Sequence, residues 1–124
     1  MSRLFILIFP LLVATSLQAA ENPGVVVMTV CDLKSGKTLA DAQKVTDSWL
    51  AIMSNKHPGK RIESKILLPL IGDTRPDLVF IDEFEDEVTF GQVKMTERAE
   101  ASEVMSEWGE TARCSESAMF LEAN

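Results

Sequence analysis

The 124-residue chain contains no tyrosine, one histidine and two cysteines, and its 12 Lys and Arg residues are outnumbered by 19 Asp and Glu residues. One histidine cannot supply a cluster of imidazole ligands, and two cysteines cannot form a four-thiolate zinc site. The formal net charge of -7 at pH 7 opposes binding to a nucleic-acid backbone, which requires clustered Lys and Arg. We therefore expect no metal, no cofactor and no nucleic-acid partner.

The first 20 residues, MSRLFILIFPLLVATSLQAA, have the pattern of a signal peptide. Arg3 precedes an apolar stretch from Leu4 to Val13, and Ala19 and Ala20 suit a cleavage site. The apolar stretch is short for a membrane span of about 20 residues. We expect residues 1–20 to be removed during export to the periplasm or the exterior, without a membrane anchor. Residues 21–124 then form a single domain, since this length supports one hydrophobic core.

Export changes the interpretation of Cys31 and Cys114, the only cysteines in the chain. An oxidising compartment favours a disulfide between them. Redox-active pairs are usually close in sequence, as in Cys-x-x-Cys, whereas these two enclose most of the mature domain. We therefore predict a structural disulfide.

The mature chain begins with the β-branched run Val25 to Cys31, which predicts a strand. Thr38 and Asp41 resemble a capping box, and an apolar stripe at helical spacing follows, which predicts a helix over 39–55. His57-Pro58-Gly59 ends this helix and predicts a solvent-exposed turn around His57.

The second half of the chain predicts two strands, a helix and a last strand. Residues 62–71 and 78–84 form a hairpin around turn residues 72–77. An apolar stripe beginning at Ala101 and a row of glutamates from Glu97 predict an amphipathic helix, with a short helical piece before it at 88–95. Residues 117–123 are expected to form the last strand.

This order predicts an α+β fold of the ferredoxin-like type, β-α-β-β-α-β, with two helices on one face of an antiparallel sheet. In that topology the last strand lies beside the first, which brings Cys31 near Cys114. Two helices cover one face only, yet the strands carry apolar residues on both faces. We therefore expect homodimerisation through the uncovered face, as in a dimeric α/β-barrel.

The segment Cys31 to Asp41, together with Trp49, resembles the opening of small exported proteins with the dimeric α/β-barrel fold. That superfamily includes cofactor-independent antibiotic-biosynthesis-type monooxygenases and haem-degrading enzymes. The resemblance implies a cavity between the sheet and the helices. The haem-degrading branch places an iron-ligating histidine on the second helix, and residues 85–114 contain none.

Both tryptophans lie on apolar helix stripes, where they either anchor the helices to the sheet or line the cavity. The candidate lining residues are Trp49, Met53, Phe80, Met105 and Trp108, and no catalytic residue stands out. The favoured hypothesis is a non-catalytic exported homodimer that binds a partner or a small apolar ligand. The alternatives are a cofactor-independent monooxygenase-like enzyme and a module that docks a different protein on the sheet face.

Three further groups carry weaker signals. The acidic run 82–87 lacks the spacing of a calcium loop, and we expect a solvated turn that favours the next helix N-terminus. The methionines are dispersed, so they indicate core filling rather than Cu(I) binding. The basic residues Lys56, Lys60, Arg61 and Lys65 are expected to form solvated surface.

Overall fold

The computed structural model describes residues 22–72 and 76–123. The expected signal peptide at 1–20 and the middle of the expected turn at 72–77 therefore lie outside the described residues. The elements in chain order are β1 (Val25–Leu33), α1 (Leu39–Lys56), β2 (Ile62–Leu67), β3 (Leu78–Phe84), α2 (Glu87–Glu100), α3 (Ser102–Thr111) and β4 (Ala112–Leu121).

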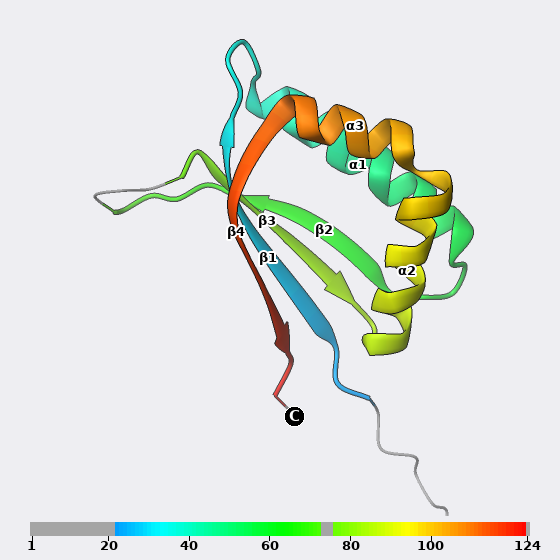
Figure 1. Cartoon of the computed structure of the whole chain (residues 1–124). Helices are drawn as coiled ribbons and strands as arrows, with labels where there is room; N and C mark the ends of the chain where they lie inside the picture. The colour runs from blue at the N-terminus through cyan, green and yellow to red at the C-terminus, as the bar shows by residue number, and fades with distance from the viewer. Residues whose placement is uncertain (1–21, 73–75, 124) are drawn as a thin grey trace, which may run out of the picture.

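The four strands form one antiparallel sheet in the order β2-β3-β1-β4. All three described helices cover the same face of this sheet, with α1 and α3 side by side and α2 at one end (Figure 1). This is the predicted β-α-β-β-α-β arrangement, with the second helical segment divided in two.

Helix α1 begins and ends for local reasons that the sequence carries. The Thr38 hydroxyl accepts a hydrogen bond from the Asp41 backbone N–H, and the Asp41 carboxylate accepts one from the Thr38 backbone N–H. This reciprocal capping box satisfies two N–H groups that a helix start leaves free. At the other end His57 closes the helix, and Gly59 follows with φ of 77°, a conformation that favours glycine. The predicted helix is confirmed.

The second helical segment differs from the expectation in its boundaries. Helix α2 starts at Glu87 because the Asp86 carboxylate accepts a 2.7 Å hydrogen bond from the Thr89 backbone N–H. The chain then leaves helical geometry at Ala101, where ψ is 23°, and α3 starts one residue later. The predicted helical piece at 88–95 and the amphipathic helix after it are both present, but the boundary between them was wrong, because no proline or glycine marks the break at Ala101.

Strand boundaries also shift around the cysteines. The last strand starts at Ala112 instead of residue 117, and β1 continues to Leu33, so both cysteines lie inside strands. Cys31 and Cys114 are direct partners in the β1–β4 ladder, with Cα atoms 4.0 Å apart, and form the predicted disulfide across 83 residues. At the other edge β2 ends at Leu67, so Pro69 follows the strand.

The core lies between the helices and the covered face of the sheet. Val25 of β1 and Phe84 of β3 are completely buried there, against Trp49 and Met53 of α1 and Val93 of α2. The Trp49 and Phe84 rings meet edge to face with centroids 6.4 Å apart. This contact ties the first helix to the centre of the sheet.

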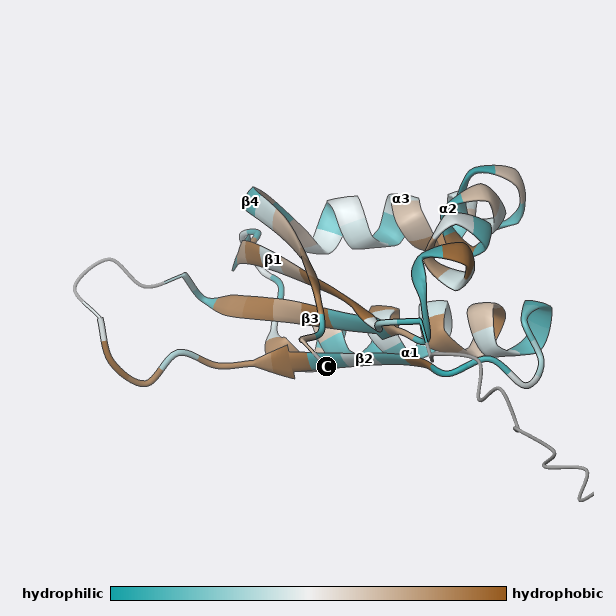
Figure 2. Cartoon of the chain, turned by 90° about the horizontal axis from the view of Figure 1, so that it is seen from below, coloured by the Kyte–Doolittle hydropathy of each residue, from teal (hydrophilic) through white to brown (hydrophobic). Residues whose placement is uncertain are grey.

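The opposite face of the sheet has no helix over it in the described part of the chain (Figure 1). Strand alternation and the ladder register place eight apolar side chains on it, which we call the open face: Val26, Met28, Val30, Leu67, Val79, Ile81, Ala118 and Phe120. Phe120 and Leu67 are about half exposed. In Figure 2 the end of β2 and the start of β3 have the colour of hydrophobic residues. Lys65 and Glu83 pair at 2.8 Å on this face.

No helix among the described residues has the length and hydrophobicity that a membrane span requires.

Candidate functional site

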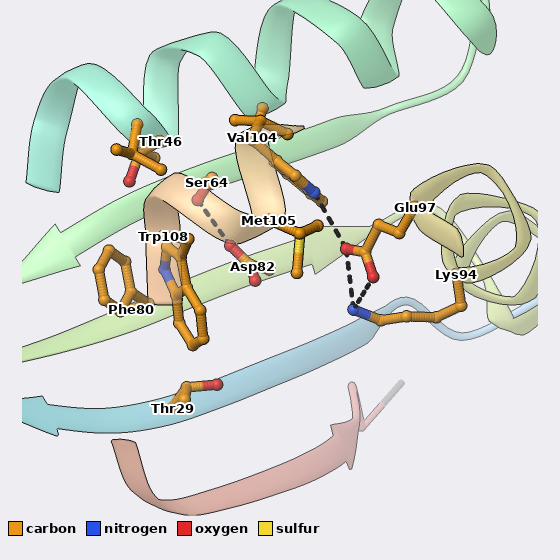
Figure 3. Close-up of a pocket in the computed structure, with 12 residues that line it drawn as sticks. Thr29, Thr46, Ser64, Phe80, Asp82, Lys94, Glu97, Val104, Met105 and Trp108 are labelled. Atoms are coloured by element: carbon orange, nitrogen blue, oxygen red, sulfur yellow. Dashed lines mark hydrogen bonds and ion pairs between the residues drawn. The ribbon is translucent and has the colours of Figure 1, made fainter. Parts of the chain in front are cut away.

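A cavity of about 100 Å³ lies between the sheet, α1, α2 and α3 (Figure 3). Strands supply its floor and helices its walls. The residues around it are Thr29, Val45, Thr46, Trp49, Ser64, Phe80, Asp82, Lys94, Glu97, Val104, Met105 and Trp108.

The floor of the cavity is formed by side chains from three neighbouring strands. Thr29 on β1 pairs with Phe80 on β3, and Ser64 on β2 pairs with Asp82 on β3. Because side chains alternate along a strand, Phe80 and Asp82 share the covered face with Leu78 and Phe84. One carboxylate therefore lies among apolar residues beneath the helices.

Asp82 is the ionisable group that the fold places deepest in this floor. The Ser64 hydroxyl donates a 2.6 Å hydrogen bond to its Oδ1 atom. Burial raises the pKa of the Asp82 carboxyl above its ordinary value of 3.8, while the Ser64 hydrogen bond and the Lys94 ammonium oppose this rise. The group can accept a hydrogen bond from a ligand when ionised and donate one when protonated.

Two charged side chains of α2 occupy one wall. The Lys94 ammonium lies 3.0 Å from both carboxylate oxygens of Glu97, and the Trp49 indole N–H donates to Glu97 Oε1 at 3.0 Å. Figure 3 shows this chain of contacts running from α2 to α1. It holds the Trp49 ring in place and leaves Lys94 and Glu97 neutralising each other.

The remaining wall is apolar and largely aromatic. The rings of Phe80 and Trp108 lie with centroids 5.5 Å apart and planes inclined at 54°. Val104 and Met105 of α3 lie beside them, and Val45 of α1 lies on the other side. Six of the twelve lining residues are apolar and six are polar, so the cavity offers a small molecule both apolar contact and hydrogen-bonding groups.

Four of the five residues predicted to line a pocket come together around the cavity: Trp49, Phe80, Met105 and Trp108. Met53 does not. It lies one turn beyond Trp49 on α1, over the end of the sheet where Val25, Ile62 and Phe84 pack, and is fully buried in that core. A shared apolar stripe on a helix does not separate residues above a cavity from residues above solid packing.

The acidic run 82–87 does not behave as one solvated turn. Asp82 and Glu83 belong to β3 and point to opposite faces of the sheet, while Asp86 caps α2 as the charge argument predicted. The sequence did hold a signal for Asp82, since it stands two residues from Phe80 and two from Phe84 in an apolar strand. The density of acidic residues in the run predicted solvent exposure, whereas alternation along the strand puts Asp82 on the same face as Phe80 and Phe84.

His57 was expected in a solvent-exposed turn, and the structure corrects this. Its ring is partly buried, and its Nε2 atom lies 2.9 Å from the Thr96 hydroxyl of α2. The side chain thus joins the end of α1 to α2. In the residues that the structure covers, no group of three or more His, Cys, Asp or Glu side chains is arranged to hold a metal ion.

No protein-family model matches the sequence, and no curated protein matches it. Solved structures do match. One is SnoaB, a cofactor-independent oxygenase from Streptomyces nogalater, with a TM-score of 0.58 and 14% identity over 82% of this chain and 95% of that one. Another is a putative monooxygenase from Shewanella loihica PV-4, with a TM-score of 0.57 and 14% identity over 85% and 99% of the two chains.

A third is a dimeric ferredoxin-like protein of unknown function from Thermobifida fusca, with a TM-score of 0.53 and 10% identity over 84% of this chain and 93% of that one. The chain has the ferredoxin-like fold. The fold class predicted from the sequence is therefore confirmed, and structures of similar fold include those of an oxygenase and a putative monooxygenase. Identities of 10–14% establish the fold alone, so the function must be argued from the cavity.

Proposed function

We propose that this protein is an exported homodimeric domain that holds a small, mostly apolar ligand in the cavity under α1 and α3 and releases it unchanged. The observation that carries the proposal is the cavity itself. Apolar side chains form half of the lining around about 100 Å³ of space, Lys94 and Glu97 pair with each other on the wall, and the Asp82 carboxylate lies at the floor with Ser64 as its hydrogen-bond partner. Such a site gives a ligand both apolar contact and one orienting polar interaction.

Dimerisation is supported by the open face. Seven of its eight apolar side chains are exposed or partly exposed, all but Ile81, and such an apolar sheet face is typical of an interaction surface. The ferredoxin-like neighbour from Thermobifida fusca is described as dimeric. A second copy placed on this face would bury these side chains while leaving the helix-side cavity of each copy intact.

Export is supported by the leader pattern of residues 1–20 and by the Cys31–Cys114 disulfide. Disulfides persist in oxidising compartments and are rare in the cytosol. The proposed protein is therefore a periplasmic or secreted binder whose fold is held closed by one cross-link.

The test is native mass spectrometry of the purified protein, followed by denaturation and identification of any released small molecule. We expect a dimer mass, an intact disulfide and a ligand displaced by added competitors without chemical change. The variant Val104→Phe should fill the cavity and abolish retention, because Val104 lies on its wall. Val88→Phe makes the same change at an exposed position of α2 and serves as the matched control.

Different results would replace the proposal by one of its alternatives. Oxygen uptake with conversion of the bound compound would indicate the monooxygenase-like enzyme, in which Asp82 would be the candidate base. A heteromeric mass would indicate a module that docks another protein. Equal ligand retention by Val104→Phe and Val88→Phe would show that the cavity is not the binding site.

A further inference from the structure

The charges around the cavity are unbalanced in a way that points to the kind of ligand it binds. Three ionisable side chains line it, namely Asp82, Lys94 and Glu97. Lys94 and Glu97 form a close ion pair, with both carboxylate oxygens 3.0 Å from the ammonium. Asp82 has only the neutral Ser64 hydroxyl as its hydrogen-bond partner among the described residues. Among the described residues the Asp82 carboxylate thus forms no ion pair, although the Lys94 ammonium is near enough to lower its pKa.

We propose, building on the binding function above, that the cavity takes a small primary amine, with its ammonium group on Asp82 and its apolar part against Phe80 and Trp108. Ser64 occupies the Oδ1 atom of the carboxylate, and Oδ2 has no hydrogen-bond partner in the described part of the chain. An ammonium group has three N–H donors, and its positive charge would pair with the negative charge of the carboxylate. The Phe80 and Trp108 rings, with centroids 5.5 Å apart, give the apolar part of the amine a surface to pack against.

The volume restricts the size of such an amine. About 100 Å³ is less than the roughly 150 Å³ of an engineered protein cavity that accommodates benzene. A small amine with a branched alkyl group of about three carbons therefore fits better than a ligand of benzene's size or larger. Val45, Val104 and Met105 provide aliphatic contacts for that group.

The pH dependence of ligand affinity distinguishes an amine from a neutral carbonyl compound bound in the same cavity. An amine needs ionised Asp82, so its affinity must rise as the pH rises through the pKa of that carboxyl. A carbonyl oxygen needs the protonated acid as a donor, so its affinity must fall over the same range. Burial and Glu97 raise the pKa of Asp82, while Ser64 and Lys94 lower it. These are the charged and polar groups facing Asp82 from β2 and α2.

The experiment titrates the purified protein with 2-propylamine and with 2-propanol, a neutral molecule of similar shape. The readout is the NMR signals of the Trp49 and Trp108 indole N–H groups, recorded between pH 4 and pH 7.5. We expect the amine to bind at least tenfold more tightly than the alcohol at pH 7, with affinity increasing as the pH rises. Asp82→Asn should remove at least tenfold of the amine affinity and leave the alcohol affinity within threefold.

The matched control is Asp47→Asn, which removes an exposed carboxylate from α1 and should change neither affinity. The pH series on the unaltered protein tests the same proposal should Asp82→Asn fail to fold. Tighter binding of the alcohol, or amine affinity that falls with rising pH, would overturn the amine proposal while leaving a binding cavity. If neither compound moves the indole signals, this inference and the proposed binding of a small apolar ligand both fail.

Discussion

Ser64 and Asp82 are direct cross-strand partners in the β2–β3 ladder, and the Ser64 hydroxyl donates a 2.6 Å hydrogen bond to the Asp82 carboxylate. The pair lies on the covered face of the sheet, at the floor of the cavity. A strand that would otherwise carry only apolar side chains toward the helices therefore keeps one acid there. This relationship is the source of the cavity's polarity.

Replacing Ser64 by alanine should raise the pKa of Asp82 further, because the hydroxyl hydrogen bond favours the ionised carboxylate. The lost hydrogen bond should also lower the free energy of unfolding at neutral pH by about 1 kcal/mol. Carboxyl-carbon NMR against pH gives the first quantity and urea unfolding the second. Ser48→Ala is the control, since that hydroxyl bonds the Lys44 carbonyl of its own helix. An unchanged pKa in Ser64→Ala would contradict the assigned role of the hydroxyl.

Asp82 should make the stability of the protein depend on pH in a particular direction. Its pKa is raised in the folded state, so its contribution is fully present below 3.8 and is lost as the pH rises through the folded-state pKa. The stability of Asp82→Asn relative to the unaltered protein should therefore increase between about pH 4 and neutrality. Urea unfolding over this range measures the difference, and Asp47→Asn accounts for the general loss of a negative charge. If the stability of Asp82→Asn relative to the unaltered protein decreased with rising pH, burial would not be destabilising the ionised Asp82 carboxylate.

Loss of the disulfide should be strongly destabilising. A cross-link spanning 83 residues restricts the unfolded chain enough to contribute about 4.5 kcal/mol in the chain-entropy model. Cys31→Ala combined with Cys114→Ala should lower the free energy of unfolding by about 4 kcal/mol, as measured with urea. A reductant should destabilise the unaltered protein similarly and have no effect on the double variant. Equal stability of both proteins would show that packing alone holds β4 on β1.

A charge on the open face should separate the proposed dimer. Met28→Glu places a carboxylate in the middle of that face, where association would bury it unpaired. We expect at least a tenfold weaker association by sedimentation at micromolar concentrations, with an unchanged circular dichroism spectrum. Met95→Glu makes the same change on the exposed side of α2 and should remain dimeric. If both variants and the parent have the same mass, the open face is not the dimer interface.

Local features of the chain predict much of this fold. The Thr38–Asp41 capping box, the helix stop at His57-Pro58-Gly59 and the β-branched strands depend on residues a few positions apart. The pairing of Cys31 with Cys114 could be inferred because these are the only two cysteines, and because the predicted strand order places the last strand beside the first. The break at Ala101 could not, because its neighbours continue the apolar stripe and the turn depends on packing of α3 along α1.

The candidate site shows where local information ends. Helix spacing and strand position predicted that Trp49, Phe80, Met105 and Trp108 lie between the helices and the sheet, while the cavity itself was implied by the resemblance to dimeric α/β-barrel proteins. The importance of Asp82 depends on Ser64, 18 residues earlier in the chain, and on Lys94 and Glu97 in another helix. Composition and spacing were sufficient for the class of fold and the cross-link, because those follow from backbone propensities and strand order. The choice of one acid among many as a partly buried carboxylate in the cavity floor, with Ser64 as its hydrogen-bond partner, follows from long-range packing, which only the folded chain brings about.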